Sequence, residues 1–235
     1  MTDRATLGAV TRGPAPWVRI TPWRGRPDVA RLDVVAPPSP SAADVDTCLD
    51  RLRESGFAEV VTGALAPADA LAFVDAGFAT RERLHLLTHD MRDLPPRTLR
   101  TRRVRGEDDE VVLAIDQQAF AEPWALDEPR LRGALSATPI ARFRLAELDG
   151  APAGYAISGR ARDHGYLQRI AVAPGAQGRG LGTGLVVDAL RWLARAGVRR
   201  TLVNTQLDNH VALRLYATCG FRLLPVGLSI LGRAL

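Results

Sequence analysis

The sequence has no lysine, and it has only two cysteines among its 235 residues. The absence of lysine excludes Schiff-base chemistry and a lysine general base. Cys48 and Cys219 are too few for a disulfide framework, and no cluster has zinc-ligand spacing. No apolar run approaches the roughly 20 residues of a membrane span, and the first residues show no signal-peptide pattern. We therefore expect a cytoplasmic globular protein with no metal and no membrane partner.

The charge of the chain is positive, with a formal net charge of +5 that comes entirely from arginine. A cluster at residues 97–105 (RTLRTRRVR) would suit a nucleic-acid partner, and such binding would weaken steeply with salt. The other arginines are spread along the chain, as a high-GC genome would also produce. We favour this compositional explanation over nucleic-acid binding.

The order of apolar runs and turn residues divides the chain into two halves. We expect a flexible arm at residues 1–16, a first half at 17–91, a linker at 92–97 and a second half at 98–235. In the first half we predict strands at 18–23, 29–35, 58–62 and 83–91, and helices at 41–55, capped by Ser41, and 67–76. In the second half we predict strands at 99–104, 140–148, 152–158, 167–172, 200–206 and 221–231, with an Asp149-Gly150 hairpin turn between the second and third of them. We also predict helices at 108–120, 126–137, 181–196 and 208–219, the first with Val111, Ile115 and Ala119 on one face.

The two halves repeat the same short motifs, which suggests an internal duplication. The matches pair Leu52-x-x-x-Gly56 with Leu193-x-x-x-Gly197, and Phe73-x-x-x-Gly77-Phe78 with Tyr216-x-x-x-Gly220-Phe221. The first copy lacks four residues and the glycines where the second has a glycine-rich turn. Any two βαβα units that end in Gly-Phe would look alike, so chance similarity is the alternative; we favour duplication.

The glycine-rich turn follows the apolar run 167–172 and opens a helix with one apolar face, built by Leu181, Leu185, Ala189 and either Trp192 or Leu193. A glycine turn at a helix N-terminus is an anion site, because free backbone N–H groups and the helix dipole point at the ligand. A dinucleotide site would need an acidic residue about 20 residues further on, where this chain has Arg199–Thr201. A nucleoside-triphosphate loop would need a lysine.

Two spaced motifs resemble the signatures of the GNAT N-acyltransferases. Gln177-Gly178-Arg179-Gly180-Leu181-Gly182 follows Val172-Ala173-Pro174, and an Asn209, Ala212-Leu213-x-x-Tyr216 and Gly220-Phe221 series comes later. The resemblance covers about residues 98–235. It implies an α/β (α+β) fold with a central mixed, mostly antiparallel sheet and flanking helices. The first half would then be a smaller, degenerate GNAT-like copy.

The resemblance also implies acetyl-CoA as co-substrate and an amine as acceptor. The pyrophosphate would bind the amides at the helix start, and the pantetheine arm would pair with the preceding strand. Tyr216 would be the catalytic acid that protonates the leaving thiolate; the alternative is a core tyrosine. The implied cofactor-binding residues are Ile170, Ala171, Val172, Gln177, Gly178, Arg179, Gly180, Leu181, Gly182, Thr183, Asn204, Asn209 and Tyr216.

Two parts of the mechanism stay open in the sequence. The strand before the glycine turn carries Tyr166, Gln168 and Arg169 where some family members have a glutamate, so the base is unassigned. Asp163, His164 or Glu147 could serve as the base through a water molecule. Direct attack of the amine on the thioester is favoured over an intermediate acylated on Cys219.

The acceptor would lie near Phe120, Glu122 and Trp124 and the 222–227 loop, in a region that resembles acetyltransferases of ribosomal proteins. A small-molecule amine and a protein N-terminus fit equally, in a monomer or a homodimer. A non-catalytic acyl-CoA-binding sensor is the competing function.

Overall fold

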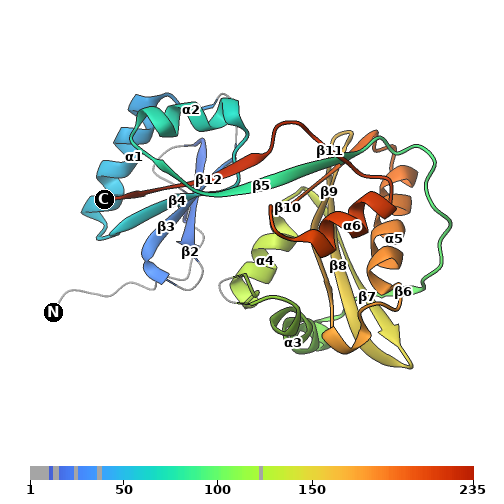
Figure 1. The fold of residues 1–235 in the computed structure, drawn as a ribbon. Helices are drawn as coiled ribbons and strands as arrows, with labels where there is room; N and C mark the ends of the chain where they lie inside the picture. Colours follow the sequence, from blue (N-terminus) through green and yellow to red (C-terminus); the bar gives the residue numbers. More distant parts are fainter. Residues whose placement is uncertain (1–10, 13–15, 24–25, 36–38, 122–123) are drawn as a thin grey trace. The chain divides into compact units, whose positions relative to one another are not determined.

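The computed structural model describes residues 11–12, 16–23, 26–35, 39–121 and 124–235 (Figure 1). The chain forms two compact units. Unit 1 comprises Met1–His85 together with Pro225–Leu235, and unit 2 comprises Leu86–Leu224. The boundary therefore falls within a strand rather than in the segment 92–97, which has neither helix nor strand.

Unit 1 contains a mixed sheet and two helices, α1 (Ala42–Glu54) and α2 (Pro67–Asp75). Ser41 starts α1 as predicted: its hydroxyl accepts from the Asp44 amide, while the Asp44 carboxylate accepts from the Ser41 amide. Within the arm expected to be flexible, Thr11 and Arg12 pair with a strand. The strands lie in the order β1 (Thr11–Arg12), β2 (Val18–Trp23), β3 (Arg26–Val34), β4 (Glu59–Thr62), β12 (Leu228–Ala234) and β5 (Ala79–His89).

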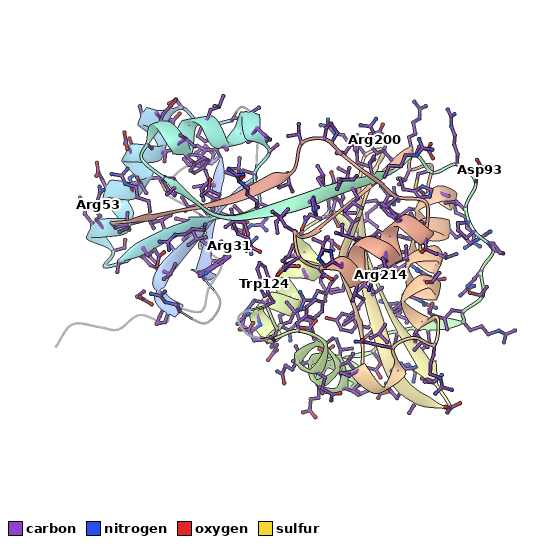
Figure 2. The ribbon with its side chains drawn as sticks, viewed as in Figure 1. Arg31, Arg53, Asp93, Trp124, Arg200 and Arg214 are labelled. Carbon is purple, nitrogen blue, oxygen red and sulfur yellow. The ribbon has the colours of Figure 1, made fainter. Side chains whose placement is uncertain are left out.

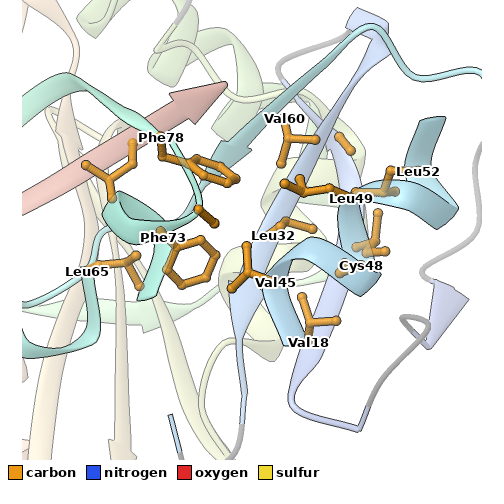
Figure 3. Close-up of a cluster of buried hydrophobic side chains, with 14 of the residues drawn as sticks. Val18, Leu32, Val45, Cys48, Leu49, Leu52, Val60, Leu65, Phe73 and Phe78 are labelled. Carbon is orange, nitrogen blue, oxygen red and sulfur yellow. The ribbon is translucent and has the colours of Figure 1, made fainter. Parts of the chain in front are cut away.

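The core of unit 1 is built from both helices and the strands beneath them (Figure 3). Phe73 is completely buried, and its ring meets Phe78 edge to face with centroids 5.3 Å apart. Full burial of such a ring stabilises a fold by about 1.5–3 kcal/mol. Phe73 therefore serves the packing of unit 1.

The strands of unit 2 form a sheet in the order β5, β10 (Arg200–Gln206), β9 (His164–Val172), β8 (Ala151–Ala161), β7 (Ile140–Leu148) and β6 (Thr101–Arg103), with β11 (Arg222–Leu223) paired to the end of β5. Asp149 and Gly150, both with positive φ, form the predicted hairpin turn between β7 and β8. Only β9 and β10 are parallel among the registered pairs of this unit's described strands.

Helices cover both faces of this sheet (Figure 1). On one face α3 (Asp109–Ala119) and α4 (Glu128–Ser136) pack through Val112, Ile115 and Leu131. The other face carries α5 (Leu181–Arg195) and α6 (His210–Thr218). Short 3-10 turns at Gly106–Asp108 and Pro174–Ala176 precede α3 and α5.

Four helices of the two units end in the same way, with a glycine at positive φ followed by a residue whose amide bonds back to the helix. Phe78 donates to the Phe73 carbonyl, and Phe221 donates to the Tyr216 carbonyl, both at 3.0 Å. The four glycines are Gly56, Gly77, Gly197 and Gly220. The repeated sequence motifs thus form equivalent helix ends.

The structure corrects two predicted details. Residues 221–231 are not one strand: β11 and β12 are separate, and β12 pairs with β4 and β5 in unit 1. In α3 the buried positions are Val112, Ile115 and Asp116, so Ile115 lies on the buried face as expected, whereas Val111 is only partly buried. Among the described residues, no helix is long and apolar enough to cross a membrane.

Candidate active site

The two parallel strands of unit 2 separate partway along their length. Their registered pairs run from Arg200 opposite His164 to Leu202 opposite Tyr166. Beyond this point β9 continues to Val172 and β10 to Gln206 without further pairing between them in the described chain. The other edge of β9 stays bonded to β8, with Ala171 opposite Tyr155. One edge of β9 near residues 170–172 is therefore available to an extended ligand.

The predicted glycine turn lies at the end of this opening. Gly178 and Gly180 have φ of +74° and +81°, and nothing lies within 4 Å of a Cβ built on either. Gly180 is the N-cap of α5 and supplies no side-chain cap, and the first turn holds no acidic residue. The first described backbone bond is Gly184 N–H to the Gly180 carbonyl at 2.9 Å. The described structure thus gives residues 178–183 no internal acceptor for their amides.

Other predicted cofactor residues surround the turn. Gln177 donates to the Val172 carbonyl at 3.2 Å, so this side chain orders the end of β9 and occupies one acceptor of the strand. Arg179 is exposed and lies 3.5 Å from Asp149. Gly182 packs in the first turn of α5, where an added Cβ would lie 3.4 Å from Leu215.

The two predicted asparagines lie on β10 and at the start of α6. Asn209 is the N-cap of α6, where its side chain accepts from the Ala212 amide at 3.0 Å. Asn204 is exposed on β10 within the separated part of the strand.

Tyr216 lies on α6 in the same apolar cluster as Ile170 and Val203, which come from the separated parts of β9 and β10. Its ring packs against Phe221 with centroids 5.6 Å apart. Among the described residues the hydroxyl has no hydrogen-bond partner. Burial raises the pKa of Tyr216 to about 12, although the positive charge of Arg169 acts to lower it. The hydroxyl is thus protonated at neutral pH and can act as an acid.

A buried network absent from the sequence prediction lies on the face covered by α3. Arg169 Nε and Nη2 each donate to one oxygen of Asp116 at 2.7 Å, and Nη2 also donates to the Trp124 carbonyl at 2.9 Å. Tyr155 donates its hydroxyl to Asp116, and Arg169 stacks on the Phe120 ring at 3.6 Å. Burial alone would lower the pKa of Arg169, but the bonds to Asp116 outweigh it and raise that pKa.

The remaining acceptor and base candidates are placed as follows. Trp124 precedes α4 (Figure 2), whereas Glu122 lies outside the described residues. Glu147 is bonded to Arg102 at 2.6 Å, and exposed Asp163 and His164 are bonded to each other at 2.8 Å. The described contacts therefore leave the base unassigned.

The residues present fit the group that the sequence implies. A pyrophosphate needs converging N–H donors without competing acceptors or carboxylates, which the glycine turn and the α5 N-terminus provide. An amide-bearing arm needs an unpaired strand edge, which β9 provides beyond Leu167.

The chain is similar in sequence to known proteins. The profile of the acetyltransferase (GNAT) family matches residues 110–221. A mycothiol acetyltransferase of Acidothermus cellulolyticus is 33% identical over 189 residues, which are 68% of this chain and 57% of the relative. A candidate ribosomal protein bS18 alanine N-acetyltransferase of Bacillus subtilis is 30% identical over 121 residues, 52% of this chain and 79% of the relative. The chain spans about half the length of the curated mycothiol acetyltransferases it matches.

Solved structures share the fold. A tandem GNAT protein from the clavulanic acid biosynthesis pathway aligns with a TM-score of 0.68 and 15% identity over 92% of this chain and 78% of its own. A GCN5-related N-acetyltransferase from Kribbella flavida aligns with a TM-score of 0.60 and 20% identity over 86% of this chain and 80% of its own. The mixed sheet with flanking helices is thus the fold of these proteins, and the chain belongs to the acetyltransferase (GNAT) family.

Proposed function

We propose that the chain is an acetyl-CoA-dependent N-acetyltransferase whose one working site lies in unit 2. The observation that carries the proposal is the opening between β9 and β10 beside the uncapped glycine start of α5. It provides an anion site and a free strand edge next to each other. Ile170–Val172 would hold the pantetheine arm, and the amides of residues 178–183 would hold the pyrophosphate. Asn204, Asn209 and Tyr216 would line the opening.

Unit 1 shows what the equivalent elements look like without such a site. The parallel pairing of β3 with β4 covers every residue of β4, from Glu59 opposite Val29 to Thr62 opposite Leu32. At the α1 start, Ser41 and Asp44 satisfy each other's amides, and Asp44 would repel an anion. These differences support our proposal that the first half is a degenerate copy which has lost cofactor binding.

The chemistry that acetyl-CoA supplies when bound is an acetyl group on a thioester. The acceptor nitrogen attacks its carbonyl carbon; a C–N bond forms, the C–S bond breaks, and the amine loses one proton to solvent. The Tyr216 hydroxyl donates a hydrogen bond to the departing sulfur, and the thiolate takes its proton from solvent; full proton transfer from Tyr216 is the alternative. A thiol pKa near 8.5, against about 12 for Tyr216, makes this transfer uphill at equilibrium. Tyr216 therefore acts as a hydrogen-bonding acid while negative charge develops on sulfur.

The acceptor belongs to one of two classes suggested by the relatives' names: a molecule related to mycothiol, or the N-terminal alanine of a ribosomal protein. Phe120 and Trp124 would border its site. A panel of small amines and of peptides with N-terminal alanine, assayed for release of free thiol from acetyl-CoA, separates the two classes.

Substitution of Tyr216 by phenylalanine tests the proposal. Because the hydroxyl has no described hydrogen bond, Tyr216→Phe should leave the melting temperature nearly unchanged, while kcat falls about 10²- to 10⁴-fold. Thr218→Val is the control, since it removes a hydroxyl from the exposed side of the same helix.

Three results discriminate between the alternatives. An unchanged kcat in Tyr216→Phe would exclude its acid role. Acetyl-CoA binding without thiol release on any amine would favour the non-catalytic sensor. Binding by neither wild type nor variant would refute the cofactor site itself.

A further inference from the structure

The network around Arg169 joins two parts of unit 2 that the proposed reaction must hold in register. Arg169 lies on β9 directly before Ile170, whose backbone is part of the proposed pantetheine edge. Its partner Asp116 lies near the end of α3, and the Asp116 carbonyl accepts the amide of the proposed acceptor residue Phe120 at 2.9 Å. One side chain therefore connects β9, called here the thioester strand, with the acceptor wall, which is the part of the proposed acceptor site formed by Phe120 and Trp124.

Four contacts fix that wall. Arg169 bonds to both Asp116 oxygens and to the Trp124 carbonyl, and its plane covers the Phe120 ring. Asp116 also accepts the Leu126 amide at 2.6 Å. The residues on both sides of positions 122–123 are thus tied to the same ion pair.

The burial and the charge balance of Arg169 indicate that its side chain supports the site and does not bind the substrate directly. The side chain of Arg169 is 15% exposed and that of Asp116 is 0% exposed. Two parallel N–H···O bonds give such a pair a defined geometry, and the carboxylate neutralises the guanidinium. Arg169 is therefore unsuited to bind an anionic acceptor, and its planar shape, rather than its charge alone, supports the wall.

We propose that Arg169 is a positioning residue, which acts through Asp116, Phe120 and the Trp124 carbonyl to hold the acceptor amine against the thioester strand. This role rests on the proposed function of the site. Within the described part of the chain, no hydrogen bond of Arg169 reaches the glycine turn, α5 or α6. Acceptor use should therefore depend on Arg169 far more than acetyl-CoA binding does.

The test is Arg169→Lys, which keeps the charge but loses the paired bonds and the flat surface over Phe120. A misplacement of about 1 Å can cost about 100-fold in rate. We expect kcat/KM for the acceptor to fall about 10- to 100-fold, while the Kd for acetyl-CoA, measured by calorimetry, stays within about twofold.

Arg31→Lys is the matched control. Arg31 also donates Nε and Nη2 to a carboxylate, that of Asp33, at 2.9 and 2.8 Å, and lies over the Trp23 ring, but it is on β3 of unit 1. This variant should retain acceptor kcat/KM within about twofold. If Arg169→Lys does not fold, Phe120→Leu removes the stacked ring while retaining the ion pair, and should raise the acceptor KM.

The outcomes separate this proposal from the proposed function. No thiol release by the wild type on any amine overturns both. Wild-type turnover combined with an unchanged acceptor kcat/KM in Arg169→Lys overturns the positioning role alone. An equal loss of acetyl-CoA affinity and acceptor kcat/KM would show a general structural defect and would also refute it.

Discussion

The two ends of α5 allow the anion site to be tested against a built-in control. Gly180 begins the helix and Gly197 follows its end, with φ of +81° and +75°. Nothing lies within 4 Å of a Cβ built on either residue. Gly180→Ala and Gly197→Ala therefore impose the same backbone strain without a clash. Only the first adds a methyl group where the proposed pyrophosphate approaches the backbone.

The expected magnitudes follow from this comparison. A non-glycine residue in the left-handed region costs about 1–2 kcal/mol, and for a chain of this size each kcal/mol lowers the melting temperature by about 2–4 °C. Both variants should show that loss. In Gly180→Ala, displacement of one charge-assisted hydrogen bond costs a further 1.5–3 kcal/mol or so of binding free energy. The Kd for acetyl-CoA should rise about 10- to 150-fold.

Thermal melts without ligand and calorimetric titration with acetyl-CoA give both quantities. Equal melting shifts with weaker binding only in Gly180→Ala would support the pyrophosphate site. Equal affinities in the two variants would refute the placement of the anion at the start of α5. A much larger melting shift in Gly180→Ala would refute the claim that the space around it is open.

Two further predictions concern buried titratable groups. His89 accepts the Met91 amide at Nδ1 and is buried, so the pKa of His89 lies below its ordinary value. The unfolded chain therefore takes up the proton at a higher pH than the folded chain does, and the free energy of unfolding should decrease as pH falls below about 6.5. Urea titrations measure the free energy of unfolding at pH 7.5 and 5.5, and its change between the two should be smaller in His89→Asn than in the wild type. An equal change in both proteins would refute the assignment to His89. Burial raises the thiol pKa of both Cys48 and Cys219 to about 11, so iodoacetamide at pH 8 should label them only as fast as the protein unfolds; rapid labelling of native Cys219 with loss of activity would instead favour an acylated cysteine.

Local patterns predicted most helices and strands because their information is local. The apolar stripe of α5, the Ser41 cap and the Asp149-Gly150 turn each depend on neighbouring residues, and all three are observed. The pairing of β12 with β4 and β5 could not be predicted in this way. Partner choice between distant strands depends on tertiary packing, which leaves no periodic signal in one segment.

In the candidate site, too, the features set by neighbouring residues could be predicted, whereas those formed by residues distant in sequence could not. Glycines beside a strand and a helix identify an anion site from backbone chemistry alone, whereas the Asp116–Arg169 pair joins residues 53 positions apart. One signal was present: Asp116 follows Ile115 on the buried side of α3, where an unpaired carboxylate would be costly. The predicted face of α3, with Val111, Ile115 and Ala119, did not include Asp116.

The position of β12 in the chain has a consequence for biosynthesis. Leu231 belongs to the core of unit 1, and the Leu231 amide donates to buried Thr62 at 2.9 Å. Unit 2 lies between these segments in sequence and is contiguous. During synthesis, unit 2 can therefore close its core on its own, whereas unit 1 emerges first and waits for a strand made after all of unit 2. Unit 1, although synthesised first, therefore completes its fold only after unit 2 has been made.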